Sequence, residues 1–125
     1  MQILIEGNIA GRTPYLYARL EERRLVLENS GPIFLVVDTG FTGSLALQQE
    51  LIDQLGLRVA AETTFLLANG QKVLLPVYLG QVRLGENSLD TWFVPGENLL
   101  GMELLAQLGR ELILKFSDDK VVLLG

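Results

Sequence analysis

The sequence predicts one mainly β domain with two short helices, and three observations lead to this expectation. The chain has 125 residues, of which 49% are hydrophobic, and this is enough for one compact core. Short runs of Val, Ile, Leu, Tyr and Phe alternate with turn residues, as they do in β proteins. Only two segments carry leucines at helical spacing. We therefore expect a single domain over residues 1–125.

Four strands are expected before residue 39. They are QILIEG (2–7), PYLYARLEE (14–22), RRLVLE (23–28) and IFLVVD (33–38), with turn residues between them. The second strand alternates between a face with two tyrosines and an aliphatic face around Leu16. The fourth strand is apolar on both faces, so we expect it to lie in the middle of a sheet.

Two short helices are expected in the rest of the chain. The first lies in LALQQELIDQLGL (45–57), where leucines recur at 47, 51 and 55 and Gly56 is a stop signal. The second lies in LLGMELLAQLGREL (99–112) and ends at Gly109. Its apolar face is predicted to carry Leu100, Leu104, Leu105 and Leu108.

Three hairpins complete the predicted secondary structure. TTFLLANGQKVLLPVYLG (63–80) turns at Asn69-Gly70, two residues that tolerate positive φ. Pro76 cannot donate to a strand ladder, which indicates an edge or a bulge there. QVRLGENSLDTWFV (81–94) turns at residues 85–88, and ELILKF (111–116) pairs with VVLL (121–124) across the turn SDDK.

Composition excludes several functional classes. The chain has 10 Lys and Arg against 15 Asp and Glu, so we expect neither nucleic acid nor an anionic membrane as a partner. It has no Cys and no His, which removes the thiol nucleophile, the thiolate metal site and the usual general base. We expect no metal and no cofactor, and any hydrolytic chemistry must use carboxylates, lysine or hydroxyls.

The expected location of the protein rests on two sequence patterns that are missing. The first residues lack a signal-peptide pattern, and the apolar run 33–37 is much shorter than a membrane span. A cytoplasmic protein is the default expectation, although a chain without cysteine is also compatible with export.

The most distinctive segment is FLVVDTGFTGSL (34–45), in which an apolar strand ends at Asp38. A carboxylate at the rim of a core is costly unless it is used or paired. Taken alone, Asp38-Thr39-Gly40 also fits an ordinary turn in which the Asp and Thr side chains bond the backbone. Further along the chain, Leu99-Leu100-Gly101 stands directly before the second predicted helix.

Together these segments resemble the retropepsin-like aspartic proteases, and most of all their small single-domain bacterial and archaeal members. The shared landmarks are VDTGFTGSL, LANGQKVLLPVY and LLGMELL, in that order, within residues 30–117. The resemblance implies a closed acid-protease β-barrel with two short helices and a flap hairpin. It also implies a homodimer that cleaves a peptide or protein substrate.

The resemblance further implies a mechanism in which two carboxylates share one proton and activate a water, without metal or covalent intermediate. This chain has one DTG sequence. Its other aspartates are expected in a helix or at turns, as surface charges: Asp53, Asp90, Asp118 and Asp119. A second copy of the chain would therefore supply the second catalytic Asp38 across a two-fold axis, and the pair would titrate as one unit.

Other roles follow from the resemblance position by position. Thr39 would lock the two loops across the dimer, and Gly40 would allow backbone and substrate to approach closely. The segment that passes beside the loop and supports it would be Leu99, Leu100 and Gly101. The flap tip, which would close over an extended peptide, would be Leu67, Ala68, Asn69 and Gly70.

Three positions depart from the family pattern. Phe41 stands where many relatives carry Ala or Ser, and its ring would either narrow a substrate pocket or enter the core. Met102 and Thr42 replace an Arg–Asp pair of the viral members, so the interface would be stabilised differently. Two alternatives stay open: a catalytically silent dimerisation or peptide-binding module with this fold, and an unrelated small β-barrel in which residues 38–40 only form a turn.

Overall fold

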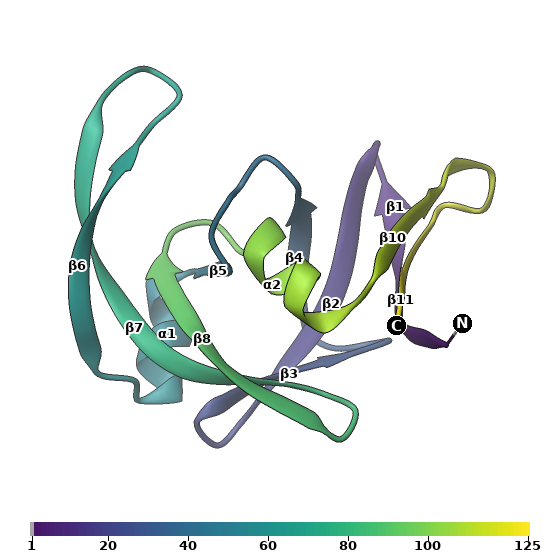
Figure 1. Ribbon diagram of the computed structural model, residues 1–125, viewed down its shortest axis with the longest axis horizontal. Helices are drawn as coiled ribbons and strands as arrows, with labels where there is room; N and C mark the ends of the chain where they lie inside the picture. The colour runs from purple at the N-terminus through teal and green to yellow at the C-terminus, as the bar shows by residue number, and fades with distance from the viewer. Residues whose placement is uncertain (1) are drawn as a thin grey trace.

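The computed structural model describes residues 2–125 and confirms the mainly β prediction. Seven strands close into a barrel (Figure 1). In order around the ring they are β2 (Thr13–Glu21), β3 (Arg24–Glu28), β7 (Lys72–Leu84), β8 (Asn87–Pro95), β5 (Leu45–Leu47), β9 (Leu99–Gly101) and β4 (Ile33–Asp38), and β4 pairs with β2.

The remaining elements lie outside this ring. Three strands extend the sheet beyond β2: β1 (Ile3–Ala10), β11 (Lys120–Leu124) and β10 (Glu111–Lys115). A fourth, β6 (Val59–Leu66), pairs with the outer part of β7. The helices are α1 (Gln49–Leu55), α2 (Met102–Leu108) and the 3₁₀ turn η1 (Phe116–Asp118). The β6–β7 hairpin projects from one side of the barrel, and the terminal strands lie on the other (Figure 1).

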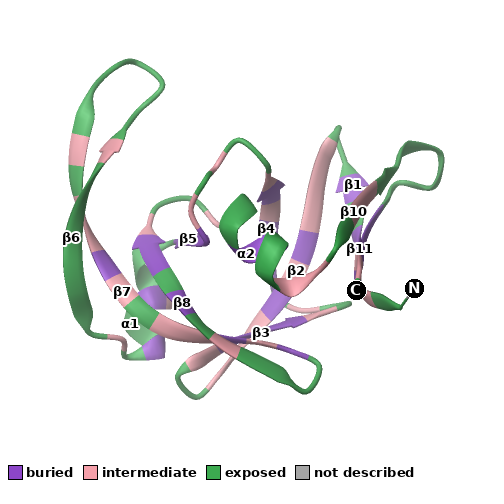
Figure 2. Cartoon of the chain, in the orientation of Figure 1, coloured by how far each residue is buried: buried purple, intermediate pink, exposed green. Residues whose placement is uncertain are grey.

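The core fills the barrel with side chains from alternate positions of its strands. On β2, Leu16 and Ala18 are fully buried, which confirms the predicted aliphatic face. Phe93 of β8 and Leu100 of β9 are fully buried as well. Figure 2 shows this buried layer in purple, whereas β6 is exposed along most of its length. Strand β6 of the flap hairpin is therefore positioned by its pairing with β7 and not by burial in the core.

Two helix predictions need correction at their starts. Residues 45–47, predicted as helix, form strand β5, and helix α1 begins at Gln49. Leu100, predicted on the face of the second helix, belongs to strand β9, and α2 begins at Met102. In both cases a leucine of the short strand stands four residues before a leucine of the helix, so the local spacing does not mark the boundary.

Strand β4 has the predicted bounds, but only one of its faces is buried. It lies between β2 and β9, as a central strand should. Phe34 is nevertheless 59% exposed on its outer face. There it packs edge-to-face against Tyr15 and Tyr17, with ring centroids 6.4 Å and 5.3 Å away. The apolar run 33–37 thus includes Phe34, whose side chain belongs to an aromatic group on the barrel surface with Tyr15 and Tyr17.

The predicted hairpins are confirmed. Gly70 has φ of +86° at the tip of the flap, and Leu84 pairs with Asn87 around the two-residue turn of the second hairpin. Pro76 lies where β7 is paired on one side only, by β6. Within residues 2–125, none of the helices has the length and apolarity that crossing a membrane requires.

Candidate active site

Asp38 is the last residue of β4, and it is half-buried at the rim of the barrel. Its backbone pairs in parallel register with Gly101 of β9. The Gly40 amide donates to Oδ1 of Asp38 at 3.0 Å, and the Phe41 amide donates to the Asp38 carbonyl at 3.1 Å. These two bonds form a tight turn that orients the carboxylate. Among residues 2–125 no donor is bonded to Oδ2, so this oxygen can bind a water or a substrate group.

The loop of residues 38–44, here called the Asp38 loop, is fixed by the start of α2. The Met102 amide donates to the Phe41 carbonyl at 2.9 Å, and the Glu103 amide donates to the Gly43 carbonyl at 3.2 Å. These bonds satisfy amides at a helix start that has no side-chain cap. The Gly101 amide donates to the Ser44 carbonyl at 2.8 Å. The helix and the loop are therefore one rigid unit of main-chain bonds.

Gly101 is required by the close approach of β9 to this loop. A Cβ atom at Gly101 would overlap the carbonyl oxygen of Gly43 and lie 2.7 Å from Cδ2 of Phe41. Leu100 beside it is fully buried in the main core. Leu99 packs against a second, small cluster, here called the outer apolar cluster, formed by Ala46, Val77 and Val94. Leu100 and Gly101 thus lie where support for the loop was expected, and Leu99 lies on the outer side.

Phe41 is partly buried between the loop and a small apolar cluster. Its ring lies against Gly43 and Gly101 and packs on the outer apolar cluster. It also lines a pocket of about 290 Å³, here called the Phe41 pocket. The other side chains of this pocket come from the flap, from β8 and from α2, and include Phe65, Val77, Trp92, Val94 and Glu103.

Thr39 lies on the other side of the loop. It is exposed and lines a separate hollow of about 310 Å³, here called the Thr39 hollow, together with Met102, Leu105, Ala106 and Leu112. These neighbours are mainly apolar and come from α2 and β10. The residues on either side of Gly40 therefore line two different hollows.

The flap tip is built as predicted but lies apart from Asp38 in the single chain. The Gly70 amide donates to the Leu67 carbonyl at 2.9 Å, and the Gln71 amide donates to Oδ1 of Asn69 at 3.0 Å. Leu67, Ala68, Asn69 and Gly70 are all exposed. Within the described residues no hydrogen bond joins them to the Asp38 loop, and Figure 1 shows the hairpin standing away from the loop between β4 and β5.

The other aspartates lie on elements outside the Asp38 loop. Asp53 lies on α1, and Asp118 and Asp119 lie at the final turn, all exposed as expected. Asp90 is also exposed, but it lies within strand β8 and not at a turn. No group of three His, Cys, Asp or Glu side chains in the described part of the chain is arranged to bind a metal ion.

Sequence reasoning missed a polar anchor beneath the loop. The Thr91 hydroxyl donates to Oγ of Ser44 at 2.7 Å, and both residues are buried. A buried polar pair of this kind specifies one position for the loop because neither hydroxyl can be left without a partner. Sequence reasoning also did not place Phe65 and Trp92 in the Phe41 pocket. Each follows a threonine in a hairpin strand, a pattern that does not distinguish a pocket residue from a core residue.

The sequence profile of the aspartyl protease family matches residues 25–104, from β3 into α2. The chain belongs to the aspartyl protease family. The match spans the Asp38 loop, the flap and β9, which are the parts that form the site described above. Comparisons with curated proteins and with solved structures give no significant match. In this member of the family, strands β1, β2, β10 and β11 lie outside the matched region.

Proposed function

We propose that this member of the aspartyl protease family is an endopeptidase that acts as a homodimer. The observation that carries the proposal is the position of Asp38, whose Oδ2 is unbonded in a rigid turn at the end of a barrel strand. Each described chain offers one carboxylate in such a position. Two carboxylates are needed for a shared-proton mechanism, so the second comes from another copy.

The chemistry uses the two Asp38 side chains in different protonation states. The ionised carboxylate takes a proton from a bound water while the oxygen of that water forms a bond to the peptide carbonyl carbon. The neutral carboxyl donates its proton to the carbonyl oxygen, which gives a tetrahedral diol. The C–N bond then breaks as the carboxyl that took the water proton passes it to the leaving nitrogen. The other Asp38, now ionised, takes a proton from a hydroxyl of the diol, so the pair again holds one proton. Both products leave without any covalent link to the enzyme.

The second copy is proposed to bind over the Thr39 hollow. This mainly apolar surface also includes Arg110 and Glu111 and reaches the Asp38 loop at Thr39. A two-fold contact that includes it would bring the two Asp38 loops together. The Phe41 pocket on the opposite side of the loop stays open to the substrate. Apolar side chains such as Phe41, Phe65 and Val94 favour an apolar substrate residue there.

The test compares the wild-type chain with Asp38→Asn on a library of fluorogenic peptides at mildly acidic pH. Wild type is expected to cleave, and Asp38→Asn is expected to bind the same peptides without cleaving them. Circular dichroism of both proteins controls for folding. If Asp38→Asn cleaves as fast as wild type, the proposal is wrong.

A mixing experiment tests the shared site separately. A tenfold excess of Asp38→Asn, exchanged with wild type, should reduce the wild-type activity to about a tenth, because most wild-type chains then have an inactive partner. An enzyme that works as a monomer would keep its full activity. Binding without turnover by the wild type would instead support the silent peptide-binding module.

A further inference from the structure

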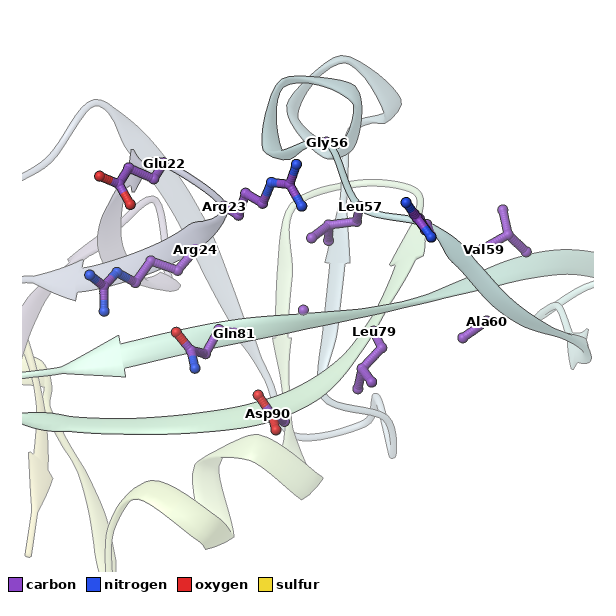
Figure 3. A pocket seen from close by; sticks show the side chains of 12 residues that line it. Glu22, Arg23, Arg24, Gly56, Leu57, Val59, Ala60, Leu79, Gln81 and Asp90 are labelled. Atoms are coloured by element: carbon purple, nitrogen blue, oxygen red, sulfur yellow. The ribbon is translucent and has the colours of Figure 1, made fainter.

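A hollow of about 630 Å³ opens where the starts of β3 and β6 meet the same edge of β7 (Figure 3). Residues 72–78 of β7 pair with β6, and residues 81–84 pair with β3. Leu79 and Gly80 lie between these two regions, and no strand within residues 2–125 pairs with them on this edge. This short open edge of a sheet can accept an extended segment.

Arginines dominate one wall of this hollow, here called the arginine notch. They are Arg23, Arg24 and Arg58. Arg24 lies 3.5 Å from a Glu21 carboxylate oxygen. Arg23 and Arg58 make no ion pair and no side-chain hydrogen bond with any residue in 2–125. Two unpaired guanidinium groups in a chain of net charge −5 mark a local site for an anion.

The notch also has carboxylates and an apolar part. Glu22 and Asp90 line it, but Figure 3 shows Glu22 directed away from Arg23, and Asp90 on the far side of β7. Arg23 instead points toward Leu57. The apolar part includes large side chains that stay accessible, with Val59 55% and Leu79 47% exposed, and Figure 3 shows Leu57 and Leu79 on opposite sides of β7. The matching ligand is therefore a carboxylate next to an apolar group.

The notch continues the Phe41 pocket along one face of the sheet. Leu79, in the notch, pairs directly with Trp92, which lines the Phe41 pocket, and directly paired residues share a face. Val77 of the pocket and Gln81 of the notch also share that face. They are four residues apart on β7, which corresponds to about 13 Å along a strand.

We infer that the arginine notch is a specificity site for an acidic residue of an extended peptide substrate. The acidic side chain lies between Arg23 and Arg58. The next side chain of the extended peptide points to the opposite face and contacts Leu79, and the peptide reaches the Phe41 pocket about four residues away. This inference rests on the proposed peptidase function for the identity of the ligand. It adds a residue preference remote from the bond that is cleaved.

The experiment measures binding to the Asp38→Asn chain by fluorescence anisotropy, so that turnover does not interfere. The probes are two fluorescein-labelled peptides of identical apolar sequence, one with a Glu-Leu-Glu segment and one with Gln-Leu-Gln. The Glu peptide should bind about tenfold more tightly, as expected for two exposed ion pairs. Each of the added changes Arg23→Gln and Arg58→Gln should reduce that difference, and the two together should abolish it. Lys115→Gln removes one charge, as either single change does, at an exposed site outside the notch, and it should preserve the difference.

A charge reversal gives a gain-of-function check that does not depend on lost binding. Arg23→Glu with Arg58→Glu should make the chain bind a Lys-Leu-Lys peptide more tightly than the Glu-Leu-Glu peptide. Equal binding of the Glu and Gln peptides overturns the inference. So does an equal effect of Lys115→Gln, or displacement by inorganic phosphate without any preference between peptides. If wild type cleaves nothing but the preference holds, the peptidase proposal fails and the notch stands; if wild type cleaves without the preference, the notch fails and the peptidase proposal stands.

Discussion

Replacing Gly101 with alanine tests whether the Asp38 loop depends on the close approach of β9. The added Cβ would overlap the carbonyl oxygen of Gly43 and lie 2.7 Å from Cδ2 of Phe41. At Gly101 φ is −96° and ψ is 173°, a conformation that alanine adopts freely, so the effect of the substitution is steric. The loop has to move away from β9 to make room for the methyl group.

We expect Gly101→Ala to lower the free energy of unfolding by about 2–4 kcal/mol. Overpacking of a tight contact costs about 1–3 kcal/mol. Displacing the loop also weakens the bonds from the Gly101 amide to Ser44 and from the Met102 amide to Phe41, each contributing about 1 kcal/mol. Because these bonds fix the position of the loop that carries Asp38, cleavage should fall by more than the loss of folded protein explains.

Urea unfolding followed by the fluorescence of Trp92, the single tryptophan, measures this change. Protein concentration is held constant because dimer formation would contribute to stability. Gly96→Ala is the matched control, since a Cβ there meets only the Cβ of Ala46, at an ordinary 3.7 Å. The free energy of unfolding of Gly96→Ala should stay within about 0.5 kcal/mol of the wild-type value. If Gly101→Ala is no less stable than this control, the steric explanation is refuted.

Two further substitutions separate chemistry from stability. Gly40→Ala places a Cβ 3.3 Å from Oδ1 of Asp38 and otherwise in open space. The free energy of unfolding should change by less than about 0.5 kcal/mol, while kcat/KM should fall at least about tenfold. Unchanged cleavage would contradict the role of Gly40 in the close approach of backbone and substrate. The hydrogen bond from Arg19 lowers the pKa of Glu21 below its ordinary 4.5, so this interaction stabilises the fold above that pH and is lost as the pH falls through the lowered pKa. Glu21→Gln should therefore have a lower melting temperature than wild type near neutral pH. Its melting temperature should fall less than that of wild type between about pH 6 and about pH 3. An equal fall in both proteins would contradict a stabilising Arg19–Glu21 interaction.

Features that depend on neighbouring residues could be predicted from the sequence. The end of β4 at Asp38 follows from an apolar run that stops at an acid and a glycine. The flap turn follows from Asn69-Gly70, because positive φ at Gly70 is a local requirement. The ordered landmarks around these two segments were sufficient to identify the family, since the matched region includes all of them up to Leu104.

Features that depend on pairing between distant segments could not be predicted. Leu45 forms a strand because it lies between Phe93 and Leu100, and neither partner is visible in the local pattern. The arginine notch exists because β3 and β6 use the same edge of β7 and leave Leu79 between them. Strand order around a barrel decides both outcomes, and an amphipathic pattern carries no information about that order.

The arrangement of the Asp38 loop would allow one short segment to contact both a second copy of the chain and a peptide in the proposed dimer. Thr39 lines a hollow formed with α2 and β10, while Phe41, two residues later, lines a pocket formed with the flap and β8. The main-chain bonds from α2 to Phe41 and Gly43 fix both directions at once. A second copy bound at Thr39 and a peptide bound at Phe41 would therefore approach Asp38 from different sides. In the proposed dimer neither partner has to be displaced for the other to bind, and tighter dimerisation would raise activity without reducing the affinity for peptide.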